Sequence, residues 1–174
     1  DLRDRGRDVP EYELTDTSAF DEGHWDVQAE YAKGSANDLL IRLTITNHGP
    51  LNTLHVVPQL WFRNTWSWGD SHESDIPKPS IKKVKDGQVI AEHETLGKFH
   101  LFAESIKQSS PPFQKPPQFL FTENETNIWK LEDKTSKRPG CKDAFHLYVV
   151  DGLKNAVHKQ SAGTKTAAVY EMSL

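Results

Sequence analysis

Residues 54–69 read LHVVPQLWFRNTWSWG, and this stretch decides the predicted fold. Side chains alternate between the two faces of a β-strand, so the stretch predicts a strand with two different faces. One face is apolar and consists of Leu54, Val56, Pro58, Leu60 and Phe62. The other consists of His55, Val57, Gln59, Trp61 and Arg63. The apolar face is expected in a core, whereas ordering the second face requires polar partners.

The end of this stretch concentrates large aromatic side chains next to polar ones. Three of the five tryptophans fall within eight residues, and the strand is expected to stop at Gly69. One reading is that these rings are ordinary packing; the other is that they form a contact surface for protein or sugar. The candidate contact residues are Trp61, Arg63, Asn64, Trp66 and Trp68.

Strand-like segments recur along the rest of the chain with almost no helical pattern, which favours an all-β antiparallel sandwich. Residues 25–63 predict a three-stranded meander, and Asp86-Gly87 predicts a hairpin between residues 80–85 and 88–93. Further strands are expected in 12–20, 98–104, 119–122, 144–150 and 165–172, and a helical turn in 127–132. The expected core comprises Leu39, Ile41, Leu43, Ile45, Leu54, Val56, Leu60 and Phe62.

The length and composition indicate one globular domain. The chain has 174 residues, 36% of them hydrophobic and 26% charged, with a net charge of −4. Residues 1–11 are expected to be a linker and residues 12–174 one sandwich domain, excised from a longer chain. The absence of a basic excess argues against nucleic acid as a partner. No signal peptide or apolar run of about 20 residues is present, so a cytoplasmic location without membrane contact is expected.

The sequence offers few groups for chemistry. Cys141 is the only cysteine, and the eight histidines show no H-x-H or H-x-x-x-H spacing, so neither a metal nor another cofactor is expected. Glu123 and Glu125 are two residues apart and would share a face, which permits an acid and base pair. The alternative is that the segment FTENETN is the polar end of a strand. No catalytic residue is assigned on these grounds.

Several stretches together resemble a known family. LHVVPQLWFRNTWSWG, FLFTENETN, KDAFHLYVV and GTKTAAVY resemble the amino-terminal region of large proteins related to glycoside hydrolase family 63, the processing α-glucosidases. The resemblance implies a β-sandwich of the galactose-mutarotase-like super-sandwich type. In that family the sandwich packs on an (α/α)6 barrel, which carries the acidic pair that hydrolyses α-glucosidic bonds with inversion.

The resemblance implies that this chain is the sandwich without its barrel. It would then be catalytically inactive itself, and its partner would be the barrel of an inverting α-glucosidase-like parent chain. Two alternatives remain open at this point. The chain is either an independent carbohydrate-binding module that recognises an oligosaccharide, or a plain protein-interaction domain.

Overall fold

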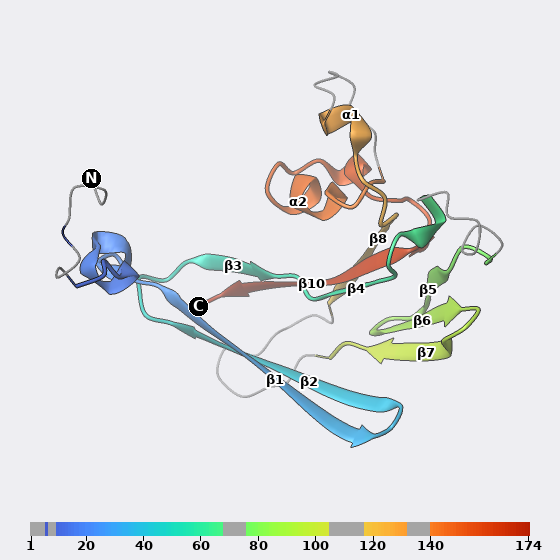
Figure 1. The fold of residues 1–174 in the computed structure, drawn as a ribbon, viewed down its shortest axis with the longest axis horizontal. Coiled ribbons are helices and arrows are strands. Elements are labelled where there is room, and N and C mark those ends of the chain that lie inside the picture. The colour runs from blue at the N-terminus through green and yellow to red at the C-terminus, as the bar shows by residue number, and fades with distance from the viewer. Residues whose placement is uncertain (1–5, 7–9, 68–75, 105–116, 132–139) are drawn as a thin grey trace. The chain divides into compact units, whose positions relative to one another are not determined.

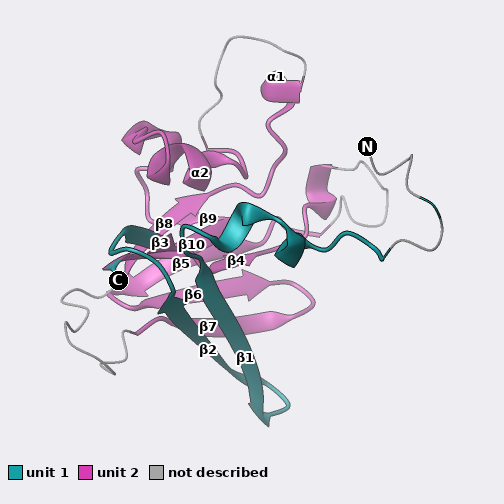
Figure 2. Ribbon diagram, turned by 90° about the vertical axis from the view of Figure 1, so that its left-hand side faces the viewer, with its two compact units in different colours: residues 1–54, 173–174 teal, residues 55–172 magenta. Residues whose placement is uncertain are grey.

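The computed structural model describes residue 6 and residues 10–67, 76–104, 117–131 and 140–174. Most of the regular structure is antiparallel β-sheet, as the sequence predicted (Figure 1). The chain forms two compact units (Figure 2). Unit 1 comprises residues 1–54 and 173–174, and unit 2 comprises residues 55–172.

Unit 1 is built around one long hairpin. Strand β1 (Trp25–Ser35) pairs antiparallel with β2 (Asp38–Asn47), with Val27 opposite Ile45 and Tyr31 opposite Ile41. Opposite residues share a face of the ladder, so one face collects apolar side chains. The other face is polar, and on it Arg42 Nε donates to Glu30 Oε2 over 2.7 Å. The strong alternation of both segments accounts for the hairpin.

Two predicted core residues lie on the apolar face of this hairpin but are exposed. Leu39 is 66% exposed and Ile41 is 55% exposed, so the prediction that they are buried is wrong. Leu43 and Ile45, nearer the base of the hairpin, are partly buried. A two-stranded ladder has no second layer of its own, and the described part of unit 1 contains no other sheet to cover this face.

The N-terminal part of unit 1 differs from its prediction. Residues 12–20 form two short 3-10 turns, η2 (Leu14–Asp16) and η3 (Ser18–Phe20), instead of a strand. Thr17 accounts for the difference, because its hydroxyl donates to Leu14 O over 2.6 Å and accepts from Ala19 N over 3.1 Å. Such local side-chain bonds compete with the ladder bonds that a strand would need.

Unit 2 contains two antiparallel sheets, and the strands of each sheet lie next to one another (Figure 1). In the first sheet the order is β3–β10–β4, and β8 also pairs with β10. In the second sheet the order is β7–β6–β5–β9. The bounds of the first sheet are β3 (Thr53–Val56), β4 (Gln59–Trp61), β8 (Gln118–Thr122) and β10 (Lys165–Ser173). Those of the second are β5 (Ser80–Lys85), β6 (Gln88–His93), β7 (Gly97–Phe102) and β9 (Ala162–Gly163).

The stretch that decides the predicted fold is divided into two strands. Pro58 stands between β3 and β4, and proline cannot donate a hydrogen bond to a ladder. Both strands pair with β10, from the C-terminal end of the chain, and β2 pairs with β1 alone in the described residues. The predicted meander over residues 25–63 is therefore wrong. A meander was predicted because these segments follow one another in sequence, but β3 and β4 pair with β10, which is more than 100 residues further along the chain.

The two sheets of unit 2 pack on a shared apolar core, and a second apolar cluster lies on the other face of the first sheet. Between the two sheets lie Ile81, Val89 and Ala91 from the second sheet and Phe119, Phe121 and Ala168 from the first, with Leu60 and Phe62 packed against them. The opposite face of the first sheet carries Leu120 and Ala167, which pack with Phe145. Strand β8 therefore sends Phe119 and Phe121 to one side and Leu120 to the other, and both sides are buried.

Helix α2 (Ala144–Val149) covers this second face, and it was predicted as a strand. A short continuous apolar run does not distinguish a buried strand from a buried helix by its period. In the helix, Phe145 and Tyr148 are three residues apart and pack on the same apolar cluster. The strand prediction for residues 144–150 is wrong for this reason.

Other local predictions are confirmed. The hairpin of β5 and β6 turns at Asp86-Gly87, where Gly87 has a φ of 73°. Strands β7, β8 and β10 lie within one or two residues of their predicted ranges, and helix α1 (Ile128–Leu131) occupies the predicted helical turn. No helix in the described ranges is long and apolar enough to cross a membrane.

Candidate functional site

Strand β4 presents the two faces that the sequence predicted. Leu60 and Phe62 pack against the core between the sheets, whereas Trp61 between them is 54% exposed. Trp61 lies opposite Lys165 of β10. The chain then turns into the 3-10 helix η4 (Thr65–Ser67), which carries Trp66. An exposed tryptophan beside two packed neighbours is unusual for a ring that only stabilises the fold.

A cavity of about 250 Å³ lies beside this segment within unit 2. It is lined by Phe62, Arg63, Thr65, Trp66, Ile76, Pro77, Pro79, His93, Thr95 and Leu96. Its walls combine aromatic rings and prolines with a guanidinium, an imidazole and two hydroxyls. The volume is below the ~300–1,000 Å³ of pockets for drug-sized ligands. It suits one inserted side chain or one sugar ring better than an oligosaccharide.

The two acidic candidates meet at one lysine next to the cavity. Lys78 Nζ lies 2.9 Å from Glu123 Oε2 and 3.0 Å from Glu125 Oε1. Thr164 Oγ1 donates to Glu123 Oε2 over 2.7 Å and accepts from Asn124 N over 2.8 Å. The two glutamate side chains are partly buried, and Lys78 is exposed. We call Glu123, Glu125 and Lys78 the acidic cluster.

The acidic cluster is joined to the aromatic segment. Trp66 Nε1 donates to Glu125 Oε1 over 3.1 Å, and Lys78 Nζ lies 5.4 Å from the centre of the Trp66 ring. Asn124 Nδ2 donates to Phe62 O over 2.8 Å. The segment after β8 therefore fixes both the backbone at the end of β4 and the position of the Trp66 ring. Such a preorganised ring loses little conformational entropy on binding a partner.

The geometry does not favour Glu123 and Glu125 as an inverting pair. Both carboxylates contact one ammonium nitrogen, so the two contacting oxygens are less than about 6 Å apart, below the roughly 6.5–9.5 Å of inverting glycosidases. Partial burial alone would lower the pKa of Lys78, but hydrogen bonds to Glu123 and Glu125 and their charges raise it above the ordinary lysine value. The ammonium is therefore charged at neutral pH and serves as the counter-ion that the two carboxylates share.

The remaining sequence-predicted residues are distributed unevenly. Arg63 is exposed and lines the cavity, and Trp68 lies outside the described residues. Asn64 is partly buried, and its Oδ1 atom is buried with no hydrogen-bond partner among the described residues. Such an acceptor calls for a partner.

Three residues of the site were not predicted from the sequence: Lys78, His93 and Thr164. Lys78 stands in a proline-flanked loop, IPKP, which gives no periodic signal. His93 ends β6 and stacks on Phe62 at a ring separation of 5.3 Å, a contact between strands of different sheets. Thr164 precedes β10 and lies just outside the strand predicted over residues 165–172. His93 and Thr164 are distant in sequence from the aromatic stretch and reach the site by long-range packing, whereas Lys78 follows the stretch closely but in a segment without a pattern.

Replacing Lys78 by Met is expected to destabilise the chain by roughly 1 kcal/mol at pH 7, because two partly buried carboxylates lose their counter-ion. In the unchanged chain, the raised pKa of Lys78 means that its contribution is fully present below about pH 10.4 and is lost as the pH rises through the folded value. Urea unfolding of both chains between pH 4 and 11 measures these effects.

The matched control is Lys83→Met, since Lys83 forms an exposed ion pair with Asp86 in the β5–β6 turn. Its effect should be smaller and should depend less on pH. Equal effects of the two changes would show that the acidic cluster behaves as an ordinary surface pair.

Comparisons with known proteins identify one informative relative. The chain is similar to an uncharacterized Saccharomyces cerevisiae protein, YMR196W, with 31% identity over 192 aligned positions. The match covers 96% of this chain and 18% of the yeast protein, so the chain spans less than a fifth of that relative. No family model matches the chain, and no solved structure matches it.

Proposed function

We propose that this chain is a non-catalytic β-sandwich region of a larger glucosidase-like glycoside hydrolase. Its role is to support an (α/α)6 barrel elsewhere in the parent chain, and the barrel hydrolyses α-glucosidic bonds. The extent of the match supports the proposal, since nearly all of this chain aligns with a small part of a much longer relative. The acidic cluster also supports it, because its two carboxylates share the Lys78 ammonium and are set too close for an inverting pair.

The surface that meets the barrel is the end of β4 with the adjoining cavity. The observation that carries this assignment is the exposure of Trp61 between two packed neighbours. The ring of Trp66, held by Glu125, lies on the same short segment. An exposed aromatic side chain that a partner can bury is typical of the anchor residues of a protein interface.

A carbohydrate-binding module is the second candidate function. The observation in its favour is the cavity, in which the Trp66 ring and the Arg63 guanidinium are wall residues. A sugar ring stacks on an aromatic face while donors bind its hydroxyls. The cavity is small, and docking also explains the exposure of Trp61, so we favour docking.

The test replaces Trp61 by Ala in the full-length parent chain and in this 174-residue chain. In the parent, hydrolysis of an aryl α-glucoside should fall at least about tenfold or the melting transition should split, because the interface loses its anchor. In the 174-residue chain, the free energy of unfolding should change by less than about 1 kcal/mol, as for an exposed side chain. The matched control is Phe102→Ala, an exposed aromatic on β7.

The outcomes separate the candidates. A loss of about 3–5 kcal/mol in the 174-residue chain would show that Trp61 is a core residue and would refute the docking surface. Calorimetric titration of the 174-residue chain with maltotriose provides the second arm. Binding that Trp66→Ala abolishes would establish the carbohydrate module instead. An unaffected parent enzyme would also contradict docking.

A further inference from the structure

The base of the β1–β2 hairpin brings together two histidines that are 24 residues apart in sequence. His24 immediately precedes β1 and His48 immediately follows β2, and His48 N donates to His24 O over 2.9 Å. Asp26 of β1 is two residues after His24, and His24 continues the extended chain, so the two side chains are on the same face. The ladder register therefore places two imidazoles and a carboxylate next to one another.

The distances within this group are close to those of a metal site. His48 Nε2 lies 2.8 Å from Asp26 Oδ2, and His24 Nε2 lies 3.7 Å from Asp26 Oδ1. One ligand atom from each of the three residues lies within 4.8 Å of the others. Donor atoms bonded at about 2.0–2.1 Å to a tetrahedral ion are roughly 3.3 Å apart. The ligand atoms are up to 4.8 Å apart, and rotation of the side chains shortens these separations toward the value for a bound ion. All three side chains are partly exposed and so have room to rotate.

His24 has an unmet hydrogen-bonding capacity. Its Nδ1 atom is buried and has no partner within the described ranges, and its Nε2 atom is beyond hydrogen-bond distance of Asp26. The ring stacks on that of His48 with centroids 4.8 Å apart and planes inclined by 18°. Buried polar atoms without partners are rare in proteins. The atom that faces Asp26 is Nε2, so a metal ion shared with Asp26 would bind Nε2 and would leave Nδ1 without a partner.

The backbone around the two histidines is fixed by a glycine pair. Gly23 has a φ of +103°, and a Cβ atom added to it would lie 2.5 Å from Gly49 Cα. Asn47 holds the other side of the turn, because its Oδ1 accepts from Gly49 N over 2.9 Å and its Nδ2 donates to Pro50 O over 3.0 Å. The Cα positions of His24 and His48 are therefore set before any ligand binds, which lowers the cost of assembling a site.

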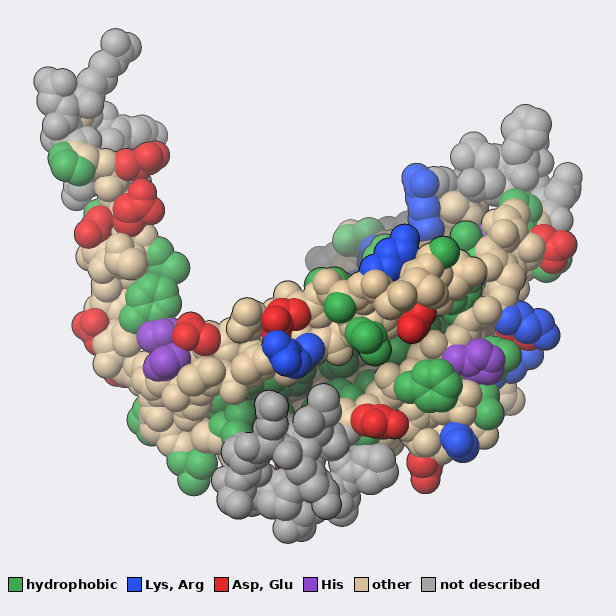
Figure 3. All heavy atoms as spheres, turned by 90° about the horizontal axis from the view of Figure 1, so that it is seen from below, with side chains coloured by type: hydrophobic (Ala, Val, Ile, Leu, Met, Phe, Trp, Pro, Cys, Tyr) green, Lys and Arg blue, Asp and Glu red, His purple; other side chains and the backbone are tan. Residues whose placement is uncertain are grey.

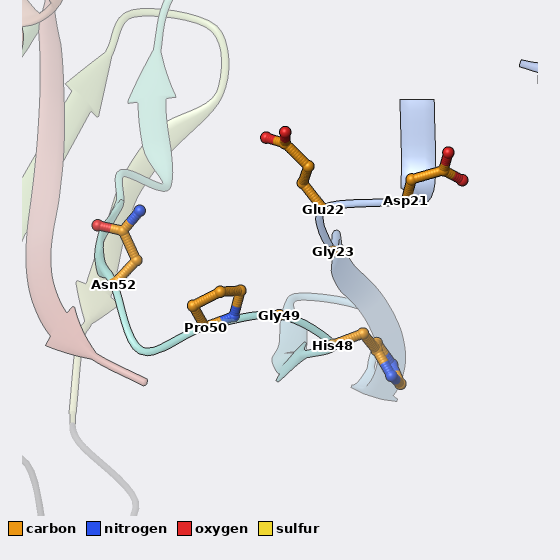
Figure 4. A pocket seen from close by; sticks show the side chains of 7 residues that line it. All are labelled: Asp21, Glu22, Gly23, His48, Gly49, Pro50 and Asn52. Atoms are coloured by element: carbon orange, nitrogen blue, oxygen red, sulfur yellow. The ribbon is translucent and has the colours of Figure 1, made fainter. Parts of the chain in front are cut away.

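An open hollow of about 660 Å³ adjoins His48 within unit 1. Asp21 and Glu22 belong to its wall, and Glu22 and His48 point away from each other (Figure 4). Figure 3 shows a pair of neighbouring histidine side chains at the surface next to acidic ones. The hollow gives a hydrated cation access, and the acidic wall favours its approach.

We propose that His24, Asp26 and His48 bind one divalent transition-metal ion of the zinc class. Two imidazoles and a carboxylate are ligands that zinc prefers, whereas calcium requires six to eight oxygens and magnesium near-octahedral oxygen ligands. Three protein ligands leave the fourth tetrahedral position to water, facing solvent. Histidine spacing within single segments predicts no metal site, whereas this group is formed by residues that lie across the ladder from each other.

Isothermal titration calorimetry of the 174-residue chain with Zn²⁺ at pH 7.5 tests the proposal. One Zn²⁺ per chain is expected, with no comparable heat from Ca²⁺ or Mg²⁺. His48→Gln should weaken binding at least about 100-fold, since loss of an outer-shell partner alone costs roughly 10–100-fold. Asp26→Asn should weaken it less, because an amide oxygen remains. The matched control is His55→Ala, whose imidazole pairs only with Glu171 at 3.8 Å in the described chain, and it should bind as the unchanged chain does.

The proposal is overturned by any of three results. These are equal Zn²⁺ affinity of His48→Gln and the unchanged chain, an equal loss from His55→Ala, or Ca²⁺ binding as tight as Zn²⁺ binding. Circular dichroism in EDTA shows whether each variant is folded. Co²⁺ added to the unchanged chain provides a spectroscopic test of metal coordination that does not depend on whether any variant folds. Visible absorption bands of four-coordinate Co²⁺ are expected, and their absence would also refute the site.

Discussion

Replacing Phe121 by Ala is expected to lower the free energy of unfolding by about 3–5 kcal/mol. Phe121 is 2% exposed and lies at the centre of the cluster between the two sheets of unit 2. Its neighbours come from both sheets, including Ile81 and Val89, so a truncated ring leaves a cavity that neither sheet can fill alone. The melting temperature should fall by roughly 6–20 °C. Urea unfolding followed by fluorescence measures the loss.

The control for this prediction is Phe102→Ala, since Phe102 is exposed on β7. Its removal should change the free energy of unfolding by no more than about 0.5 kcal/mol. If the two changes cost the same, the arrangement of two sheets around Phe121 is wrong. An unchanged denaturant slope would show that the native and unfolded states are otherwise the same.

Replacing Gly163 by Ala is expected to cost about 3 kcal/mol, at the upper end of the usual range for overpacking. Gly163 ends β9, and the chain passes from the second sheet to the first between Gly163 and Lys165. A Cβ atom at Gly163 would lie 2.3 Å from Thr122 O and about 3 Å from two more backbone atoms of Thr122. Backbone atoms of a buried strand cannot rotate away as a side chain can.

The same substitution at Gly34 is the control. A Cβ atom there would meet only the side chain of Asp38, which can move, and Gly34 does not have a positive φ. We expect little change in the melting temperature of Gly34→Ala. If Gly163→Ala melts at the same temperature as the unchanged chain, the close approach of β9 to Thr122 is not present in solution.

The two faces of β4 and the aromatic half of the candidate site could be predicted from the sequence. Alternation over residues 59–63 places Leu60 and Phe62 in the core and leaves Trp61 outside, as the structure has them. The acidic half could not be predicted. Glu123 and Glu125 were recognised as a pair, but Lys78, the counter-ion that they share, comes from a loop 45 residues before Glu123 and has no pattern of its own.

Local information was sufficient wherever the decisive contacts are near in sequence. The Asp86-Gly87 turn specifies its own hairpin. The positive φ of Gly87 and the alternation of side chains in the flanking strands are both properties of a few adjacent residues. Local information failed at residues 144–150, where an apolar run fits both a strand and a helix. It also failed at Leu39 and Ile41, where the pattern indicates an apolar face without indicating whether anything covers it.

By itself, the sequence determined the β-rich class, most strands and the orientation of side chains on each strand, because these depend on alternation and turn residues. Only the tertiary structure decided which strands are neighbours. It paired β3 and β4 with β10, joined Lys78 to Glu123 and Glu125, and set His24 opposite His48. The physical reason is that pairing and burial depend on the total packing of segments far apart in the chain. No single segment carries that information.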